Sequence, residues 1–283
     1  MTHGPLVDAH RPFPAGPASL FAGAWRERRL IAQLIRREVV GRYRGSMMGI
    51  AWSFLHPLLM LAVYTFVFSV VFEARWPGLV GEQSRIRFAL LLFVGVIAHS
   101  LLAEVLSRAP SLVIGNANYV KKVVFPLETF GWSMVGSAVF HALVGLAILL
   151  GAMALFERAP TLSALWLPVV LLPLCFVALG LAWLLASLGV FLRDIGQVTG
   201  VLSMVLMFLA PVFYPIAALP EAYRAWVYLN PITLPIEQSR IVLFTGDAPQ
   251  ALPLLQYYGV AVLFMVFGYW WFQKTRRGFA DVL

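Results

Sequence analysis

The sequence predicts an all-α, polytopic membrane protein with six transmembrane helices, an N-terminal amphipathic interface helix and short re-entrant helices between spans five and six. Of its 283 residues, 61% are hydrophobic and 12% are charged, whereas about a quarter of a soluble domain is charged. Apolar runs of about 20 residues, the length that crosses a hydrocarbon core, recur along the chain. Basic residues cluster beside these runs rather than in a separate domain, so the net charge of +8 indicates membrane topology and no nucleic-acid partner.

The N-terminal part divides into a tail, residues 1–22, and the start of a transmembrane domain, residues 23–283. The tail is rich in proline and small residues and lacks the apolar stretch of a signal peptide, so we expect a disordered segment. Residues 25–44 alternate apolar side chains at helical spacing with arginines. This pattern predicts an amphipathic helix on the membrane surface. A helix packed on a soluble partner is the alternative, and both can hold.

Six apolar runs define the expected spans. They lie at about residues 52–72, 88–106, 130–156, 165–192, 198–215 and 254–272. Between the last two, residues 223–229 and 232–244 are apolar but too short and too polar to cross. We expect interfacial or re-entrant helices there, because backbone at membrane depth must bond internally or line a water-filled cavity.

The distribution of lysine and arginine predicts the orientation. In a six-span arrangement, 15 of the 21 basic residues fall on the side that carries both termini. Because basic residues favour the cytoplasmic side, both termini are predicted to be cytoplasmic.

Sequence motifs for independent chemistry are absent. None of Lys121, Lys122 and Lys274 ends a glycine-rich phosphate loop followed by serine or threonine, so we expect ATP hydrolysis by a separate subunit. We expect no catalytic residue, no metal site and no cofactor in this chain. Two alternatives stay open: a membrane-embedded transferase acting on lipid-linked sugars, which needs acids or histidines gathered at one face, and a self-sufficient carrier, which needs coupled intramembrane charges.

Three features near the spans have structural interpretations. Glu104 precedes Arg108 by four residues, which predicts an ion pair along a helix rather than a proton relay. His99 is expected to be a polar packing contact rather than a metal ligand. Glycines recur every four residues at 41, 45 and 49 and predict a smooth helix face, with a hinge before the first span as the alternative.

Four segments resemble the type-2 ATP-binding-cassette (ABC) permeases that export lipid-linked bacterial polysaccharides such as O-antigen, capsule and teichoic acid. They are RYRGSMMG at 42–49, KKVVFP at 121–126, FLRDI at 191–195, and APVFYP at 210–215 together with NPIT at 230–233. The first joins the surface helix to span one in that family, the second is similar to the coupling-helix region, and the last resembles the external gate. His56 stands where the family pattern has asparagine.

The resemblance implies the membrane subunit of an ATP-driven exporter in the bacterial inner membrane, with a channel formed by a homodimer. Two copies of a cytoplasmic ATPase would bind ATP and magnesium, and the other partners would be lipid-linked polysaccharide and membrane lipids. It implies ATPase coupling by Asn116, Tyr119, Lys121, Lys122, Phe125 and Pro126. It also implies gate positions at Glu237 and Arg240. Because sugar rings stack on aromatic faces, Tyr64, Phe68, Phe213 and Tyr214 are candidates for the channel, with anchoring at the membrane interface or packing against lipid as the alternative.

Arg42 and Arg44 lie just before span one, at the expected depth of lipid headgroups. Guanidinium groups bind phosphate oxygens in a bidentate manner, so these residues are candidates to hold a lipid pyrophosphate. Anchoring of the helix by positive charge on the cytoplasmic side is the alternative.

Overall fold

The computed structural model describes residues 15–67, 71, 83–121, 125–157 and 159–283, and over these residues the protein is helical with no strand. Five of the described helical segments are long and apolar enough to cross a membrane: Gly49–Phe66, Arg85–Ser111, Thr129–Phe156, Leu162–Phe191 and Ala251–Val282. They coincide with the runs expected as spans one to four and six. The fold is therefore the membrane-spanning helical bundle that the composition predicts.

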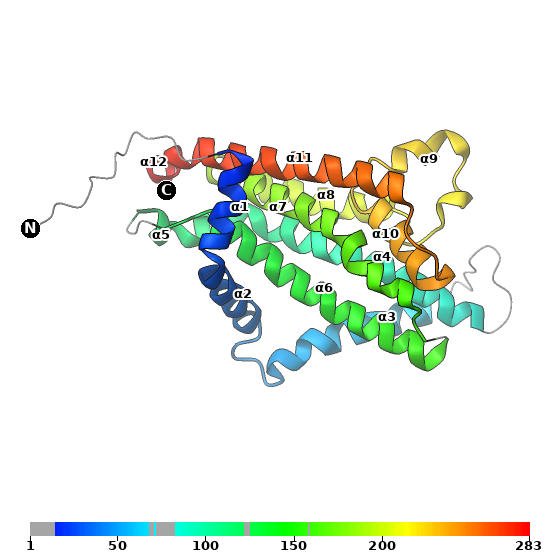
Figure 1. Ribbon diagram of the computed structural model, residues 1–283. Helices are drawn as coiled ribbons and strands as arrows, with labels where there is room; N and C mark the ends of the chain where they lie inside the picture. The colour runs from blue at the N-terminus through cyan, green and yellow to red at the C-terminus, as the bar shows by residue number, and fades with distance from the viewer. Residues whose placement is uncertain (1–14, 68–70, 72–82, 122–124, 158) are drawn as a thin grey trace, which may run out of the picture.

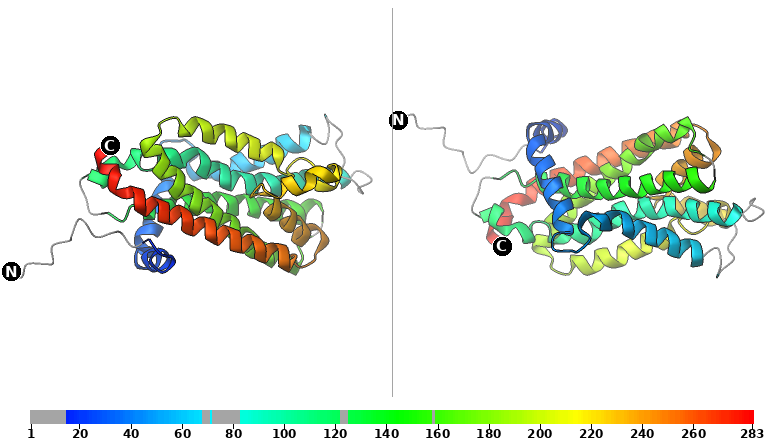
Figure 2. Two further views of the ribbon diagram at one scale, coloured as in Figure 1. Left: turned by 90° about the horizontal axis from the view of Figure 1, so that it is seen from above. Right: turned by 90° about the horizontal axis from the view of Figure 1, so that it is seen from below.

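The long helices lie side by side and alternate in direction (Figures 1 and 2). They are α3 (Trp52–Phe66), α4 (Gln83–Arg108), α6 (Thr129–Phe156), α7 (Leu167–Phe191), α8 (Ile195–Leu209) and α11 (Ala251–Thr275). One end of the bundle, the α5 end, carries α1 (Pro17–Arg26), α2 (Arg28–Arg42), α5 (Ala117–Lys121) and α12 (Phe279–Val282). The opposite end, the α10 end, carries α9 (Glu221–Val227) and α10 (Thr233–Arg240).

Helices α7 and α11 form the most intimate pair in the bundle. They cross where Gly180 faces Gly268, and a Cβ added to Gly268 would meet the backbone oxygen of Gly180. Next to this crossing the rings of Trp183 and Tyr269 pack edge to face, 5.2 Å apart. Small residues allow such close approach of backbones, which is how helices associate where lipid removes the hydrophobic driving force.

Helix α8 is shorter than the span expected at residues 198–215. It has 15 residues and ends at Leu209, and Ala210 is already extended. The residue before a proline is sterically pushed out of the helical conformation, and Ala210 precedes Pro211. Fifteen helical residues measure about 22 Å, less than the roughly 30 Å of a hydrocarbon core. The expected end of span one, residues 68–72, lies largely outside the described residues.

The N-terminal region differs from the expected tail and single helix. Helix α1 begins at Pro17, inside the expected tail, because proline suits a first helical turn and Leu20 is buried against the bundle. The chain then breaks at Glu27 and continues as α2 to Arg42. Residues 1–14 lie outside the described residues.

The glycine-rich stretch after α2 is a turn, so the predicted smooth helix face is wrong. Gly45 and Gly49 have φ angles of +85° and +52°, values that favour glycine because other side chains clash there. A Cβ at either position would meet nothing within 4 Å, so no neighbouring helix packs against them. The glycines allow the chain to turn from α2 into α3.

Candidate functional site: a polar cluster where α2 meets the bundle

A buried acid on α4 is the centre of a polar cluster near the α5 end. The carboxylate of Glu104 accepts hydrogen bonds from both terminal nitrogens of Arg42, at the end of α2, and from Arg108 Nη1 at 2.8 Å. The predicted pair between Glu104 and Arg108 is therefore present. Arg108 also bonds Glu38 of α2 at 2.7 Å, and the other oxygen of Glu38 accepts from Ser133 of α6 at 2.9 Å.

His141 of α6 connects this cluster to the turn after α2. Its Nδ1 lies 3.1 Å from Glu104 Oε2 and its Nε2 lies 3.1 Å from the Tyr43 hydroxyl. Both contacts are satisfied when Tyr43 donates to Nε2 and Nδ1–H donates to Glu104. Burial raises the pKa of Tyr43, so its hydroxyl keeps the proton that this arrangement needs. Charge-assisted bonds thus join α2 and the turn to both α4 and α6.

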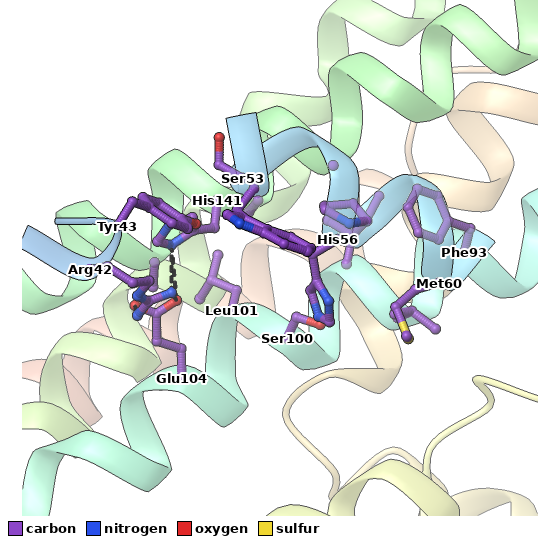
Figure 3. A pocket seen from close by; sticks show the side chains of 17 residues that line it. Arg42, Tyr43, Ser53, His56, Met60, Phe93, Ser100, Leu101, Glu104 and His141 are labelled. Carbon is purple, nitrogen blue, oxygen red and sulfur yellow. Dashed lines mark hydrogen bonds and ion pairs between the residues drawn. The ribbon is translucent and has the colours of Figure 1, made fainter. Parts of the chain in front are cut away.

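A cavity of about 220 Å³ lies beside the cluster (Figure 3). Arg42, Glu104 and His141 line one end of it, and side chains of α3, including His56 and Met60, cover the other. Among the residues that the structure describes, no group of three or more histidine, cysteine or acidic side chains is placed to hold a metal ion. Because its charged groups bond α2 to α4 and α6, the cluster is a candidate for holding and moving these helices.

Arg42 and Arg44 have different surroundings. The Arg42 guanidinium is paired with Glu104 and packed beside His141, whereas Arg44 is exposed in the turn after α2. A phosphate that binds Arg42 must compete with a carboxylate that is already bound. Arg44 is the freer of the two predicted anion-binding residues.

The residues predicted to couple to an ATPase gather at the α5 end. Tyr119 of α5 packs against the ring of Phe125 at 4.8 Å, and its hydroxyl accepts a hydrogen bond from Arg37 of α2 at 3.4 Å. Asn116 caps the preceding turn by donating to the Leu112 carbonyl at 2.8 Å. Helix α5 is thereby in direct contact with α2, and α2 carries the polar cluster.

Of the remaining predicted coupling residues, one lines a hollow next to this region, one is exposed, and one lies outside the described residues. Pro126 lines the hollow between α1 and α11, and Lys121 is exposed at the end of α5. Lys122 is outside the described residues. Arg276, at the end of α11, bonds Glu128 at 2.8 Å and the Phe125 carbonyl at 2.7 Å, so this segment is fixed to the bundle.

The two predicted gate residues of α10 are bonded to each other, and Arg240 is buried. Arg240 donates through Nε and Nη2 to the Leu91 carbonyl of α4, at 3.2 and 3.1 Å, and through Nη2 to the Val212 carbonyl at 3.1 Å. Its Nη1 binds Glu237 Oε1 at 2.9 Å. One guanidinium therefore ties α10 both to α4 and to the irregular segment that follows α8.

The aromatic residues predicted for the channel that the structure describes come from α3 and from the segment after α8. Phe213 and Tyr214 lie in the segment after α8, where Phe213 packs on Phe208 and the Tyr214 hydroxyl donates to the Leu209 carbonyl at 3.1 Å. Tyr64 is half-buried on α3. Phe68 lies outside the described residues.

Sequence reasoning missed Glu38, Tyr43, Ser133 and His141, which complete the polar cluster. The available signal was that ionisable groups at membrane depth need partners, so Glu104 and Arg108 required a search for more. Four residues separate Glu104 from Arg108, but Glu38 and His141 are 66 and 37 residues from Glu104 in the sequence. No local pattern could have joined them.

The fold and the cluster define a multi-pass membrane protein whose helix α2 is bonded to its bundle. The chain matches the ABC-2 type transporter family over residues 29–244 and belongs to that family. It is 27% identical to an O-antigen export system permease protein, RfbA, from Myxococcus xanthus, over 90% of this chain and 95% of that one. An RfbA from Klebsiella pneumoniae is 23% identical over the same shares. The capsule polysaccharide export inner-membrane protein CtrC of Neisseria meningitidis is 24% identical over 78% of this chain and 81% of its own.

Proposed function

We propose that this chain is the transmembrane subunit of an ATP-driven exporter that moves lipid-linked polysaccharide across the bacterial inner membrane. The observation that carries the proposal is the match along nearly the whole chain to permeases named for O-antigen export. The sequence lacks a phosphate-binding loop, so ATP and magnesium belong to a separate ATPase subunit. The chain itself is a permease and not an enzyme.

The α5 end faces the cytoplasm in this proposal and receives the ATPase. Both chain termini then lie on the side with the excess of basic residues. Helix α2 lies along the membrane surface, since Leu34 and Val39 are buried while Arg28, Arg29, Arg36 and Arg37 are exposed. Helix α5 and the turn before it form the docking point, with exposed Lys121, half-buried Asn116 and Tyr119, and Phe125 and Pro126 after the helix.

Motion of the ATPase reaches the bundle by a short path. A push on α5 acts on α2 through the contact between Tyr119 and Arg37. Helix α2 then acts on α4 and α6 through Glu38, Arg42 and the acceptor Glu104. Because charge-assisted hydrogen bonds are short and directional, they transmit displacement better than apolar contacts with lipid do.

A homodimer supplies the channel. Helices α3 and α8 expose large apolar side chains that their own chain leaves uncovered: Trp52, Phe54, Leu58, Leu59, Val63 and Phe66 on α3, and Val198, Val201, Met204, Val205 and Phe208 on α8. A second copy that packs near these helices encloses a conduit in which sugar rings slide on aromatic faces. Tyr64, Phe68, Phe213 and Tyr214 are the proposed aromatic contacts.

The α10 end forms the outer gate. In this proposal helices α9 and α10 re-enter the membrane from the outer side, which requires that their backbone polar groups bond within the protein or line a water-filled cavity. Release of Arg240 from the Leu91 and Val212 carbonyls would free the segment after α8 to move. Glu237 holds the guanidinium in place in the closed state.

The transferase alternative is not favoured by the chemistry of the cluster. Glu104, Glu128 and Glu237, which line cavities, are each bound by arginine, and a carboxylate held by a guanidinium is a poor general base. A self-sufficient carrier would need acids that recur in several spans.

Copurification and glycan analysis test the proposal together. The native chain should retain an ATP-binding subunit, and Tyr119→Ala with Lys121→Glu should release it, whereas Arg224→Gln at the α10 end should not. Cells that lack the chain should accumulate a lipid-linked glycan on the cytoplasmic side. A purified chain that binds no ATPase, or a deletion strain with unchanged glycan distribution, would refute the proposal.

A further inference from the structure

A groove runs along the outside of the bundle between α8 and α11, floored by α7 and closed at one end by α10. Its volume is about 790 Å³, within the range of ligand-binding pockets. Its walls are largely apolar and include Leu206, Val260 and Phe264. Its walls belong to helices of a membrane protein, so the surrounding solvent is acyl chains and not water.

The two ends of the groove differ in chemistry. Its polar residues are Tyr228, Glu237, Gln238, Gln250, Gln256 and Tyr257, and they lie toward the α10 end. Gln250 precedes the first residue of α11, so this end coincides with the place where α11 enters the bundle. Apolar Val260 and Phe264 follow further along the helix. A polar end at the bundle surface and an apolar body within it match an amphiphile with one headgroup.

The length of the groove suits one leaflet. From Gln250 to Phe264 the helix rises about 21 Å at 1.5 Å per residue, somewhat more than half of a hydrocarbon core of about 30 Å. An acyl chain that enters at the α10 end therefore ends near the middle of the membrane or slightly beyond. A groove of this length holds a phospholipid chain and is too short for a polyprenyl chain.

The charge of the lining selects among headgroups. Glu237 is the only charged side chain among the described residues that line the groove, and no lysine or arginine lines it. Arg240 bonds Glu237 Oε1 but lines a different hollow, between α4 and α10. An anionic headgroup would meet a carboxylate with no cation facing it. A headgroup with an ammonium can bind Glu237 Oε2 and the carboxamide oxygen of Gln256.

We propose that this groove is a binding site for a zwitterionic phospholipid with a primary ammonium headgroup, whose acyl chain lies between α8 and α11. The site is separate from the proposed channel surface. Leu202 and Leu206 are four residues apart and share the groove side of α8, whereas Val201, Met204 and Phe208 point to other sides of the same helix. The lipid fills a gap that the chain's own side chains leave and holds α11 to α8.

Photo-crosslinking in nanodiscs tests the site. The native protein is placed in bilayers of equal phosphatidylethanolamine and phosphatidylglycerol, with a trace of either lipid carrying a diazirine near the chain end, and labelled peptides are mapped by mass spectrometry. The ethanolamine probe should label residues of α7, α8 and α11 that line the groove severalfold more than the glycerol probe does. Excess unlabelled ethanolamine lipid should suppress that labelling. Equal labelling by both probes, or labelling spread evenly over exposed helix faces, would overturn the proposal.

Two variants and a matched control localise the effect. Leu206→Trp with Val260→Trp fills the groove and should abolish the specific labelling, while Leu263→Trp on the exposed outer face of α11 should leave it unchanged. Glu237→Gln should keep chain labelling but remove the preference for the ethanolamine probe. Retained labelling in the filled groove contradicts the site. Disulfide formation between copies that carry Leu206→Cys and Val260→Cys would show that a second copy covers the groove instead. None of these readouts depends on export or on the ATPase.

Discussion

Helices α7, α11 and α3 are all apolar, but α7 and α11 contact each other at backbone distance, whereas α3 leaves most of its surface uncovered by its own chain. In the most apolar stretch of the segment containing α7, 61% of residues are buried inside the chain, and the corresponding values are 22% for the segment containing α11 and 6% for the segment containing α3. Helix α3 is held mainly along one side, by α4 and α6, and through the turn after α2. Hydropathy therefore identifies all three as membrane helices but does not say what covers them.

The difference separates a fixed part of the bundle from an adaptable part. Helices α7 and α11 approach to backbone contact at Gly180 and Gly268, and they cannot slide without breaking that contact. Helix α3 follows a turn with two left-handed glycines and exposes most of its surface. A helix that moves during export is expected in the adaptable part, like α3, because a loosely packed helix changes its neighbours with a small change in free energy.

The largest loss of stability is expected from a side chain added between α7 and α11. Gly268→Leu puts a Cβ against the Gly180 backbone oxygen, which cannot rotate away, and should lower the free energy of unfolding by about 3 kcal/mol. Unfolding in detergent, followed by circular dichroism, measures it. Gly259→Leu is the matched control on the same helix, because a Cβ there meets nothing within 4 Å. Equal stability of the two variants would show that α7 and α11 are not in backbone contact.

A smaller loss of stability is expected from a change in the polar cluster around Glu104, which holds α2 and the turn before α3 to the bundle. Glu104→Gln removes the charge that Arg42, Arg108 and His141 share, and bonds to charged groups contribute about 1.5–3 kcal/mol each. Since both arginines are about one-third exposed, water replaces part of that interaction, and we expect a loss of about 1–2 kcal/mol.

Glu104→Gln should also reduce ATP-driven export, because α2 would lose the bond from Arg42 to α4 and keep only the one between Glu38 and Arg108. Glu221→Gln, whose side chain is 92% exposed, is the control for removal of an acid. Normal export together with a stability loss would limit the cluster to a structural role.

The sequence predicts the elements of this fold well because each one is encoded locally. Runs at residues 88–106, 130–156 and 254–272 lie within α4, α6 and α11, since length and hydropathy alone define a helix that crosses a membrane. The pair between Glu104 and Arg108 was predictable for the same reason, as one turn of helix joins them. The end of span five was missed although Pro211 gives a local signal, because hydropathy continues through residues 210–215.

The cluster could not be predicted in full because its members come together only through packing. Glu38, His141 and Ser133 reach Glu104 and Arg108 from α2 and α6, and nothing near them in the sequence specifies that meeting. The same holds for Arg240, whose bonds to carbonyls of α4 need the folded α10. Composition therefore predicts the helices, while the contacts between them need the three-dimensional structure.

A cross-linking experiment sharpens the comparison without a change in stability. In a Cys175→Ser background, which removes the only native cysteine, Leu59→Cys on α3 should form a disulfide between two copies in oxidised membranes. Leu59 is 47% exposed and faces away from its own bundle, so a second copy is its expected cover. Leu263→Cys on α11 should stay monomeric. Cross-linking at Leu263 and none at Leu59 would place the dimer interface on the fixed pair.

The smallest effect is expected for Leu59→Ala, and its size depends on protein concentration. In a diluted monomer the side chain at position 59 contacts detergent in both the folded and the unfolded state. Its truncation should therefore change the free energy of unfolding by less than about 0.5 kcal/mol. If a second copy covers α3, the loss should increase at concentrations where the dimer forms, because truncation then weakens association linked to folding. Unfolding at two protein concentrations separates the cases. A large loss that is the same at both concentrations would mean that α3 packs against its own chain as α7 does.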